Sequence, residues 1–194
     1  MTLTVLWIVG AYLLGSIPTG LLLGRLYGID VRHEGSGNIG ATNLYRTVGR
    51  KVGVITLIGD CLKGVLPVLA AHQLGLPEAM QAWVGLAAFC GHVFSIFLLF
   101  KGGKGVATAL GVFLALVPQA VAPALGIFIV IVALSRYISL GSICAAAAMP
   151  LIIWFEPHSF ELLLVTAAIA AIVIVKHHAN IGRLVAGTEN KFKA

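Results

Sequence analysis

The stretch Phe100-Lys101-Gly102-Gly103-Lys104-Gly105-Val106-Ala107-Thr108 interrupts one of the most apolar regions of this 194-residue chain. A mostly apolar run precedes it over residues 80–100, and another follows over residues 106–117. Lysine ammonium groups are expensive in hydrocarbon, so the stretch marks either a membrane surface or a water-filled cavity. Its position therefore predicts that the flanking runs are membrane-spanning helices.

The same stretch has the composition of an anion site. Its glycines let the backbone turn and present N–H groups, and Lys101 and Lys104 add positive charge just before an apolar helix. This combination suits phosphate. The alternative is a basic turn that only anchors two spans by the positive-inside rule. The stretch is not a Walker A loop, because Leu98 and Gly105 stand where that motif needs Gly and Ser or Thr.

Composition excludes an ordinary soluble domain. The chain is 59% hydrophobic and 10% charged, whereas soluble domains carry about 25% charged residues. The apolar runs have helical length and do not alternate, which predicts an all-α polytopic membrane helix bundle. Nearly the whole chain is needed for the spans, so residues 1–194 are expected to form a single integral membrane domain. The first apolar run lacks the basic segment of a secretory signal and is read as a retained span.

The expected spans cover residues 3–24, 52–71, 80–100, 140–155 and 159–175. The run over residues 106–134 contains Pro118 and Pro123, so it is either one kinked span or two short ones. Two short spans would be about 13 residues each, short against the usual ~20.

Charge placement favours the two short spans. With seven crossings, every Lys and Arg except Lys63 falls on one side: Arg25, Arg32, Arg46, Arg50, Lys51, Lys101, Lys104, Arg136, Lys176, Arg183, Lys191 and Lys193. The opposite loops carry Glu78, Glu156 and Glu161. The positive-inside rule then predicts seven transmembrane helices, with the N-terminus outside and the C-terminus in the cytoplasm.

Two further polar clusters are expected on the same cytoplasmic side. Residues 35–43, Gly-Ser-Gly-Asn-Ile-Gly-Ala-Thr-Asn, form either a second nest of donors or a flexible glycine turn, and Arg46 follows. After the last span, His177, Asn180 and Arg183 share one helical face. His177 and His178 point to different faces, so no shared metal is expected. The external loops carry no comparable polar cluster, which argues against a transporter and favours an enzyme at the cytoplasmic leaflet.

Ionisable residues also occur inside the spans. Asp60 and Lys63 lie one helical turn apart and are expected to neutralise each other, with a minor contribution to the site as the alternative. His92 is expected to be a polar residue facing the bundle and not a ligand. Cys61, Cys90 and Cys144 lie in apolar runs and are read as small core residues.

The motifs GSGNIGATN, GHVFSIFLLFKGGKGVAT and HHANIGRLVAGTEN, in this order, resemble the bacterial acyl-phosphate:glycerol-3-phosphate acyltransferases, the PlsY family. The resemblance covers almost the whole chain. It implies transfer of a fatty acyl group from acyl phosphate to the 1-hydroxyl of sn-glycerol 3-phosphate, giving 1-acylglycerol 3-phosphate for phospholipid synthesis. Glycerol 3-phosphate, fatty acyl phosphate and membrane lipid are then the expected partners. No cofactor, metal or nucleic acid is expected, and the oligomeric state is left open.

The hypothesis for the reaction assigns a role to each cluster. Lys104 and Arg46 bind the glycerol phosphate, with Thr108 and Ser36 as further donors. The amides of residues 37–43, together with Asn43 and Asn180, hold the acyl phosphate and its oxyanion. The complete expected set is His177, Asn180, Lys104 and Ser36 as catalytic residues, with Gly37, Asn38, Gly40, Thr42, Asn43, Arg46, Lys101, Gly102, Gly103, Thr108, Arg183 and Glu189 binding substrate.

Two questions stay open at this level. The proton of the attacking hydroxyl passes either to His177 or to the phosphate of the donor. Glu189 either orients Lys104 or Arg183, or caps the C-terminus structurally. Two other functional classes are alternatives: a transporter of phosphorylated solutes, and a structural subunit whose basic loops dock a soluble partner or anionic lipid.

Overall fold

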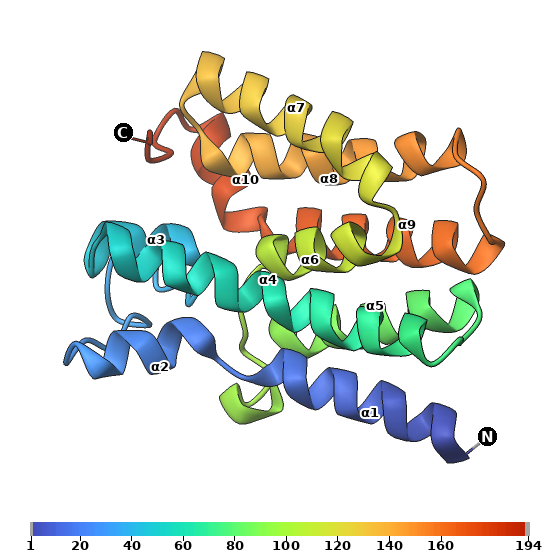
Figure 1. The fold of residues 1–194 in the computed structure, drawn as a ribbon. Helices are drawn as coiled ribbons and strands as arrows, with labels where there is room; N and C mark the ends of the chain where they lie inside the picture. The colour runs from blue at the N-terminus through green and yellow to red at the C-terminus, as the bar shows by residue number, and fades with distance from the viewer. Residues whose placement is uncertain (1, 193–194) are drawn as a thin grey trace. The chain divides into compact units, whose positions relative to one another are not determined.

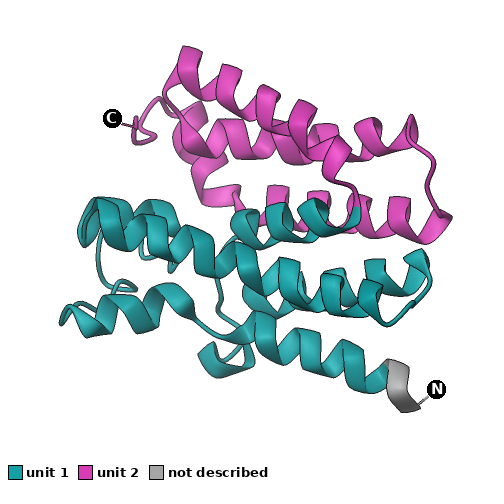
Figure 2. Cartoon of the chain, viewed as in Figure 1, with its two compact units in different colours: residues 1–116 teal, residues 117–194 magenta. Residues whose placement is uncertain are grey.

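The computed structural model describes residues 2–192, so Lys193 lies outside the described residues. Within this range all the regular secondary structure is helical, which confirms the all-α prediction (Figure 1). The chain divides into two compact units, one ending at Leu116 and the other beginning at Val117 (Figure 2).

The first unit contains two basic loops, the first over residues 27–40 and the second over residues 101–105. Its helices are α1 (Thr2–Ser16), α2 (Thr19–Leu26), α3 (Ala41–Thr47), α4 (Arg50–Gln73), α5 (Glu78–Val93), the short 3₁₀ helix η1 (Ile96–Leu98) and α6 (Val106–Leu116). The expected first span is not one continuous helix, because Ile17 and Pro18 separate α1 from α2. Proline has no N–H to continue a helical ladder, which accounts for the break. The expected third span also ends its α-helix early, at Val93.

Glycines let the helices of the first unit pack closely. A methyl group at Gly91 of α5 would collide with the carbonyl oxygen of Tyr12 on α1, and one at Gly15 of α1 would collide with that of Ala88 on α5. The pair α4 and α6 is equally close, since a methyl at Gly111 would meet the carbonyl of Cys61. Small residues at such contacts bring helix backbones together and support packing in lipid.

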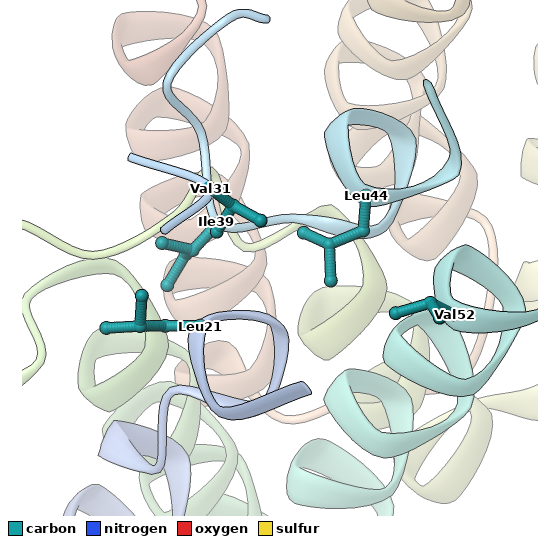
Figure 3. Close-up of a cluster of buried hydrophobic side chains, with 5 residues drawn as sticks. All are labelled: Leu21, Val31, Ile39, Leu44 and Val52. Carbon is teal, nitrogen blue, oxygen red and sulfur yellow. The ribbon is translucent and has the colours of Figure 1, made fainter. Parts of the chain in front are cut away.

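A small apolar core fixes the first basic loop. Leu21 of α2, Val31 and Ile39 of the loop, Leu44 of α3 and Val52 of α4 are at most 4% exposed and pack together (Figure 3). Both ends of the loop therefore carry buried anchors, while the polar residues between them stay at the surface. This core holds the segment from Gly35 to Asn43 against α2 and α4.

The second unit contains α7 (Pro118–Ser135), α8 (Ile138–Trp154), α9 (Phe160–Lys176) and α10 (His178–Val185). The uncertain run over residues 106–134 divides at Val117 into α6 and α7, so it is not one continuous helix. Pro118 is the first residue of α7, a position where its missing N–H costs nothing. The chain bends by 55° between α9 and α10.

By length and composition, four helical segments of the described chain can cross a membrane, or five if the bent pair α9 and α10 is one span. The four are Val5–Leu26, Arg50–Gln73, Glu78–Leu98 and Pro118–Ser135. The helices α6 and α8 are apolar but shorter. A multi-pass membrane protein follows from these segments, and the count of seven crossings stays a prediction.

Candidate active site

Asn43 organises the first basic loop. Its side-chain Oδ1 accepts the Ser36 amide at 2.9 Å, and its Nδ2 donates to the carbonyls of Val31 at 3.1 Å and Glu34 at 3.0 Å. The side chain is only 3% exposed. One amide at the start of α3 therefore closes the loop by three hydrogen bonds, and the loop is an ordered structure instead of a flexible glycine turn.

Several amides expected to bind phosphate are used inside this loop. The Gly37 amide donates to the Glu34 carbonyl at 2.9 Å, and the Gly40 amide donates to Asn38 Oδ1 at 2.8 Å. The structure gives these residues a role in shaping the loop, and substrate binding by them stays a prediction. The side chains of Ser36 and Arg46 are exposed on the loop and on α3.

The second basic loop, residues Lys101 to Gly105, folds back on the C-terminal end of α5. The Gly102 amide donates to the Val93 carbonyl and the Gly103 amide to the His92 carbonyl, each at 3.2 Å. Gly105 has a φ of 79°, and a methyl there would collide with the ring of Phe89. Only glycine satisfies both the backbone conformation and the close contact, so the sequence Gly-Gly-Lys-Gly fixes the shape of this loop.

A strained apolar turn leads into this loop. Leu99 and Phe100 have φ angles of 51° and 63°, in the left-handed region that bulky residues rarely adopt. Their side chains are 82% and 58% exposed. The turn is closed by the Phe100 amide, which donates to the Ser95 carbonyl at 2.8 Å.

Lys104 lies two residues before Val106, the first residue of α6. The first helical hydrogen bond of this region joins the Ala109 amide to the Gly105 carbonyl at 2.7 Å. The preceding amides have no carbonyl four residues earlier within the helix, and the helix dipole makes this end positive. A lysine beside such an end is chemically suited to bind phosphate.

Thr108 has a packing contact in this structure. It is completely buried, and its hydroxyl donates to the carbonyl of Asp60 at 2.9 Å, which joins α6 to α4. Its expected contribution to phosphate binding stays a prediction. Lys101, in contrast, is exposed at the start of the loop.

In the second unit, three donors converge on the carboxylate of Glu189. Oε1 accepts the Ser139 hydroxyl at 2.7 Å and Asn180 Nδ2 at 2.6 Å, and Oε2 accepts Arg183 Nε at 2.7 Å. Burial raises the pKa of Glu189, but the hydrogen bonds from these three residues outweigh it and leave the pKa below its ordinary value. The sequence offers Lys104 or Arg183 as the residue that Glu189 orients, and the structure pairs Glu189 with Arg183.

His177 lies at the bend between α9 and α10 and is 3% exposed. The helical spacing predicts that His177 shares one straight helix with Asn180 and Arg183. The bend at His177 shows that it does not. Its Nδ1 is 2.7 Å from the Val173 carbonyl. Because a carbonyl only accepts, Nδ1 carries a proton, and in the neutral ring Nε2 is the basic nitrogen.

The structure adds partners that the sequence did not indicate. Ser139 is a lone hydroxyl in the first turn of an apolar helix, and no spacing relates it to Glu189. The expected pair of Asp60 and Lys63 is confirmed, with Lys63 Nζ 2.9 Å from Asp60 Oδ1. The same ammonium also reaches the Ile17 carbonyl, a backbone contact that no sequence pattern predicts.

Comparison with known proteins agrees with the resemblance seen in the motifs. The family model described as glycerol-3-phosphate acyltransferase matches residues 5–187. The chain belongs to this acyltransferase family. A protein named glycerol-3-phosphate acyltransferase from Trichlorobacter lovleyi is 77% identical over 194 residues, which is 100% of both chains. One with the same name from Geobacter sulfurreducens is 64% identical over 184 residues, covering 95% of each chain.

Solved structures extend the family likeness to the fold. The crystal structure of PlsY, an integral membrane glycerol 3-phosphate acyltransferase, in its glycerol 3-phosphate form is 39% identical, with a TM-score of 0.93. The alignment covers 98% of this chain and 96% of that one. The lysophosphatidic acid form of PlsY gives a TM-score of 0.90 at 38% identity, covering 98% and 95%. The expected membership of the PlsY family is thereby confirmed.

Proposed function

We propose that this membrane acyltransferase moves a fatty acyl group from acyl phosphate to the 1-hydroxyl of sn-glycerol 3-phosphate. The product is 1-acylglycerol 3-phosphate, or lysophosphatidic acid. The observation that carries the proposal is the likeness, over 98% of the chain, to PlsY in a glycerol 3-phosphate form and a lysophosphatidic acid form. The three motifs that carry the resemblance to acyl-phosphate-dependent enzymes supply the choice of donor.

The loop from Lys101 to Gly105 supports binding of the acceptor phosphate. Its shape is fixed by Gly103 and Gly105, and it presents Lys104 beside the positive end of α6. We assign the phosphate of glycerol 3-phosphate to Lys104 and to Arg46 on α3, with Ser36 as a further donor. A charge-assisted hydrogen bond to phosphate is among the stronger polar contacts that a protein makes.

The chemical step needs little from the protein, because acyl phosphate is an activated mixed anhydride. The 1-hydroxyl oxygen attacks the acyl carbonyl carbon, and a new ester C–O bond forms. The anhydride C–O bond then breaks and inorganic phosphate leaves with the bonding electrons. Proximity and stabilisation of the oxyanion are therefore the main catalytic contributions.

We assign the second unit to the oxyanion and the proton. Glu189 binds one hydrogen of Asn180 Nδ2 and fixes the orientation of that amide. We assign this amide to the oxyanion as a donor. His177, whose Nδ1 is bonded to the Val173 carbonyl, presents Nε2 as the acceptor for the hydroxyl proton. The leaving phosphate is the alternative acceptor, and substitution of His177 separates the two.

The proposal includes a topology. Seven crossings would place the basic loops and the C-terminal cluster at the cytoplasmic face of the bacterial inner membrane, as the distribution of Lys and Arg favours. The two compact units would then work as one acyltransferase domain over residues 1–194. Addition of single cysteines to the basic loops, with labelling by a membrane-impermeant reagent in intact cells and in inverted vesicles, tests this arrangement.

The direct test is a reaction with purified protein in detergent. Glycerol 3-phosphate and palmitoyl phosphate are added without metal or coenzyme A, and lysophosphatidic acid and phosphate are measured. We expect equal amounts of the two products from the wild type. Palmitoyl coenzyme A in place of palmitoyl phosphate serves as the control for donor choice. Folded protein that forms no product from acyl phosphate, or that forms it only from the coenzyme A ester, contradicts the proposal.

A further inference from the structure

The first unit buries three ionisable side chains that the proposed chemistry does not use. Asp60 and Lys63 on α4 and His92 on α5 are 2%, 5% and 4% exposed. Ionisable groups inside a membrane protein are costly and mark functional positions. A buried ion pair is also weak support for stability, since apolar replacements are often as stable. The presence of this cluster therefore calls for a role.

Lys63 connects three elements. Its Nζ lies 2.7 Å from the Ile17 carbonyl at the break between α1 and α2, 2.9 Å from Asp60 Oδ1 and 3.1 Å from His92 Nδ1. An ammonium has three hydrogens, and three acceptors surround it. The contact with Asp60 Oδ1 is an ion pair without hydrogen-bond geometry, since that oxygen has no hydrogen-bond partner within the described residues.

His92 carries this cluster to the second basic loop. Because an ammonium only donates, Nδ1 accepts from Lys63, and the ring hydrogen is assigned to Nε2. The Nε2 edge of the ring faces Gly103: a methyl there would collide with Nε2 and would lie 3.2 Å from Cδ2 and Cε1. The His92 carbonyl also accepts the Gly103 amide at 3.2 Å. The ring and the backbone of His92 thus both contact this glycine.

The backbone of Asp60 contacts the chain just after the same loop. Its carbonyl accepts the Thr108 hydroxyl in the first turn of α6 at 2.9 Å. The His92 ring of the cluster therefore contacts the loop at Gly103, and the backbone of Asp60 contacts α6 at Thr108. Lys104 lies between these two points.

We propose that Asp60, Lys63 and His92 are positioning residues for the phosphate-binding loop. Their ion cluster fixes the loop from Lys101 to Gly105 against α4 and α5, and so fixes where the Lys104 ammonium meets the acceptor phosphate. They do not touch the substrate. The inference rests on the proposed function, because it takes glycerol 3-phosphate as the ligand of that loop.

The test begins with His92→Asn. The Asn amide oxygen replaces the Nδ1 acceptor of Lys63, but the part of the ring that packs on Gly103 is lost. Small displacements of a positioning group cost up to about a hundredfold in rate or affinity. We expect KM for glycerol 3-phosphate to rise about tenfold or more, with a smaller change in kcat and an unchanged KM for palmitoyl phosphate.

A second variant keeps the test decisive if His92→Asn fails to fold. Asp60→Asn combined with Lys63→Met removes both charges together and leaves neither ion buried without a partner. The same selective rise in KM is expected. Thr56→Ala is the matched control: Thr56 is buried on α4, and its hydroxyl donates to the Val52 carbonyl of its own helix. This control is expected to keep the wild-type KM for both substrates.

Binding without turnover gives an independent readout. Glycerol 3-phosphate raises the melting temperature of a protein that binds it in the folded state. His92→Asn should need about tenfold more of the ligand for the same rise.

The outcomes separate the two proposals. If the wild-type protein forms no lysophosphatidic acid, the proposed function itself is wrong. An active wild type, with both variants folded and their KM for glycerol 3-phosphate within twofold of it, overturns the positioning role. Equal losses for both substrates, or failure of both variants to fold while Thr56→Ala folds, also overturn it, because the cluster then serves stability alone.

Discussion

Ser139 Oγ donates to Glu189 Oε1 at 2.7 Å, although 50 positions separate the two residues in the sequence. The same carboxylate binds Asn180 and Arg183 on α10. It therefore joins the first turn of α8 to the helix that carries a proposed catalytic amide. The orientation of Asn180 depends on a residue that lies beyond the end of its own helix.

Replacement of Glu189 by Ala should destabilise the protein. Three donors lose their acceptor, and Arg183 loses its partner, so we expect a loss of about 2–4 kcal/mol. For a chain of this size that corresponds to a fall in melting temperature of about 5–15 °C. Thermal unfolding in detergent measures it. Glu189→Gln keeps an acceptor oxygen and should lose clearly less, and equal losses for the two variants would contradict the account.

Stability should depend on acid through the same residue. The pKa of Glu189 lies below its ordinary value of 4.5, so its ionised form stabilises the folded state. This contribution is complete above about pH 4.5 and is lost as the pH falls through the lower folded-state pKa. As the pH falls below about 4.5, the melting temperature of the wild type should therefore fall more steeply than that of Glu189→Gln. Parallel curves for the two proteins would show that another group is responsible.

Lys104 should matter more than its neighbour Lys101. Loss of a hydrogen bond to a charged group costs about 1.5–3 kcal/mol, so Lys104→Met should lower kcat/KM by about 10- to 100-fold. Lys101→Met is the matched control, since this lysine is exposed at the start of the same loop. Steady-state rates at varied glycerol 3-phosphate provide the comparison. Similar effects from both substitutions would favour a diffuse electrostatic role for the loop.

His177→Ala tests where the proton goes. A general base contributes about 10²-fold or more, so kcat should fall by at least this amount if Nε2 accepts the hydroxyl proton. The melting temperature should be compared as well, because Nδ1 also bonds to the Val173 carbonyl. A kcat within threefold of wild type would assign the proton to the leaving phosphate.

Asn43→Ala should disorder the first basic loop. The substitution leaves the Ser36 amide and the carbonyls of Val31 and Glu34 without their partner. At about 1 kcal/mol each, the three bonds predict a loss near 3 kcal/mol, together with a higher KM. Asn38→Ala removes one bond, to the Gly40 amide, and should cost about a third as much. Unfolding and kinetics of the two variants can be measured side by side.

The sequence predicted most of the helices because apolar runs in lipid leave few alternatives to a helix. It missed the break at Pro18, since α1 and α2 together have the length of one span. The pair of Asp60 and Lys63 followed from their spacing, one turn apart on one helix. Ser139 did not, because a hydroxyl in the first turn of an apolar helix carries no sign of a partner far along the chain. The roles of Gly37 and Gly40 could not be predicted either, since only the structure shows that each backbone amide donates to an acceptor within the loop.

The turn at Leu99 and Phe100 has a consequence for handling the protein. A left-handed backbone at a bulky residue costs on the order of 1–3 kcal/mol and persists only where the surroundings hold it in place. Both side chains are largely exposed, so an apolar medium that solvates them can offset part of this cost. The choice of detergent or lipid should therefore change the stability of this turn and of the loop that follows it.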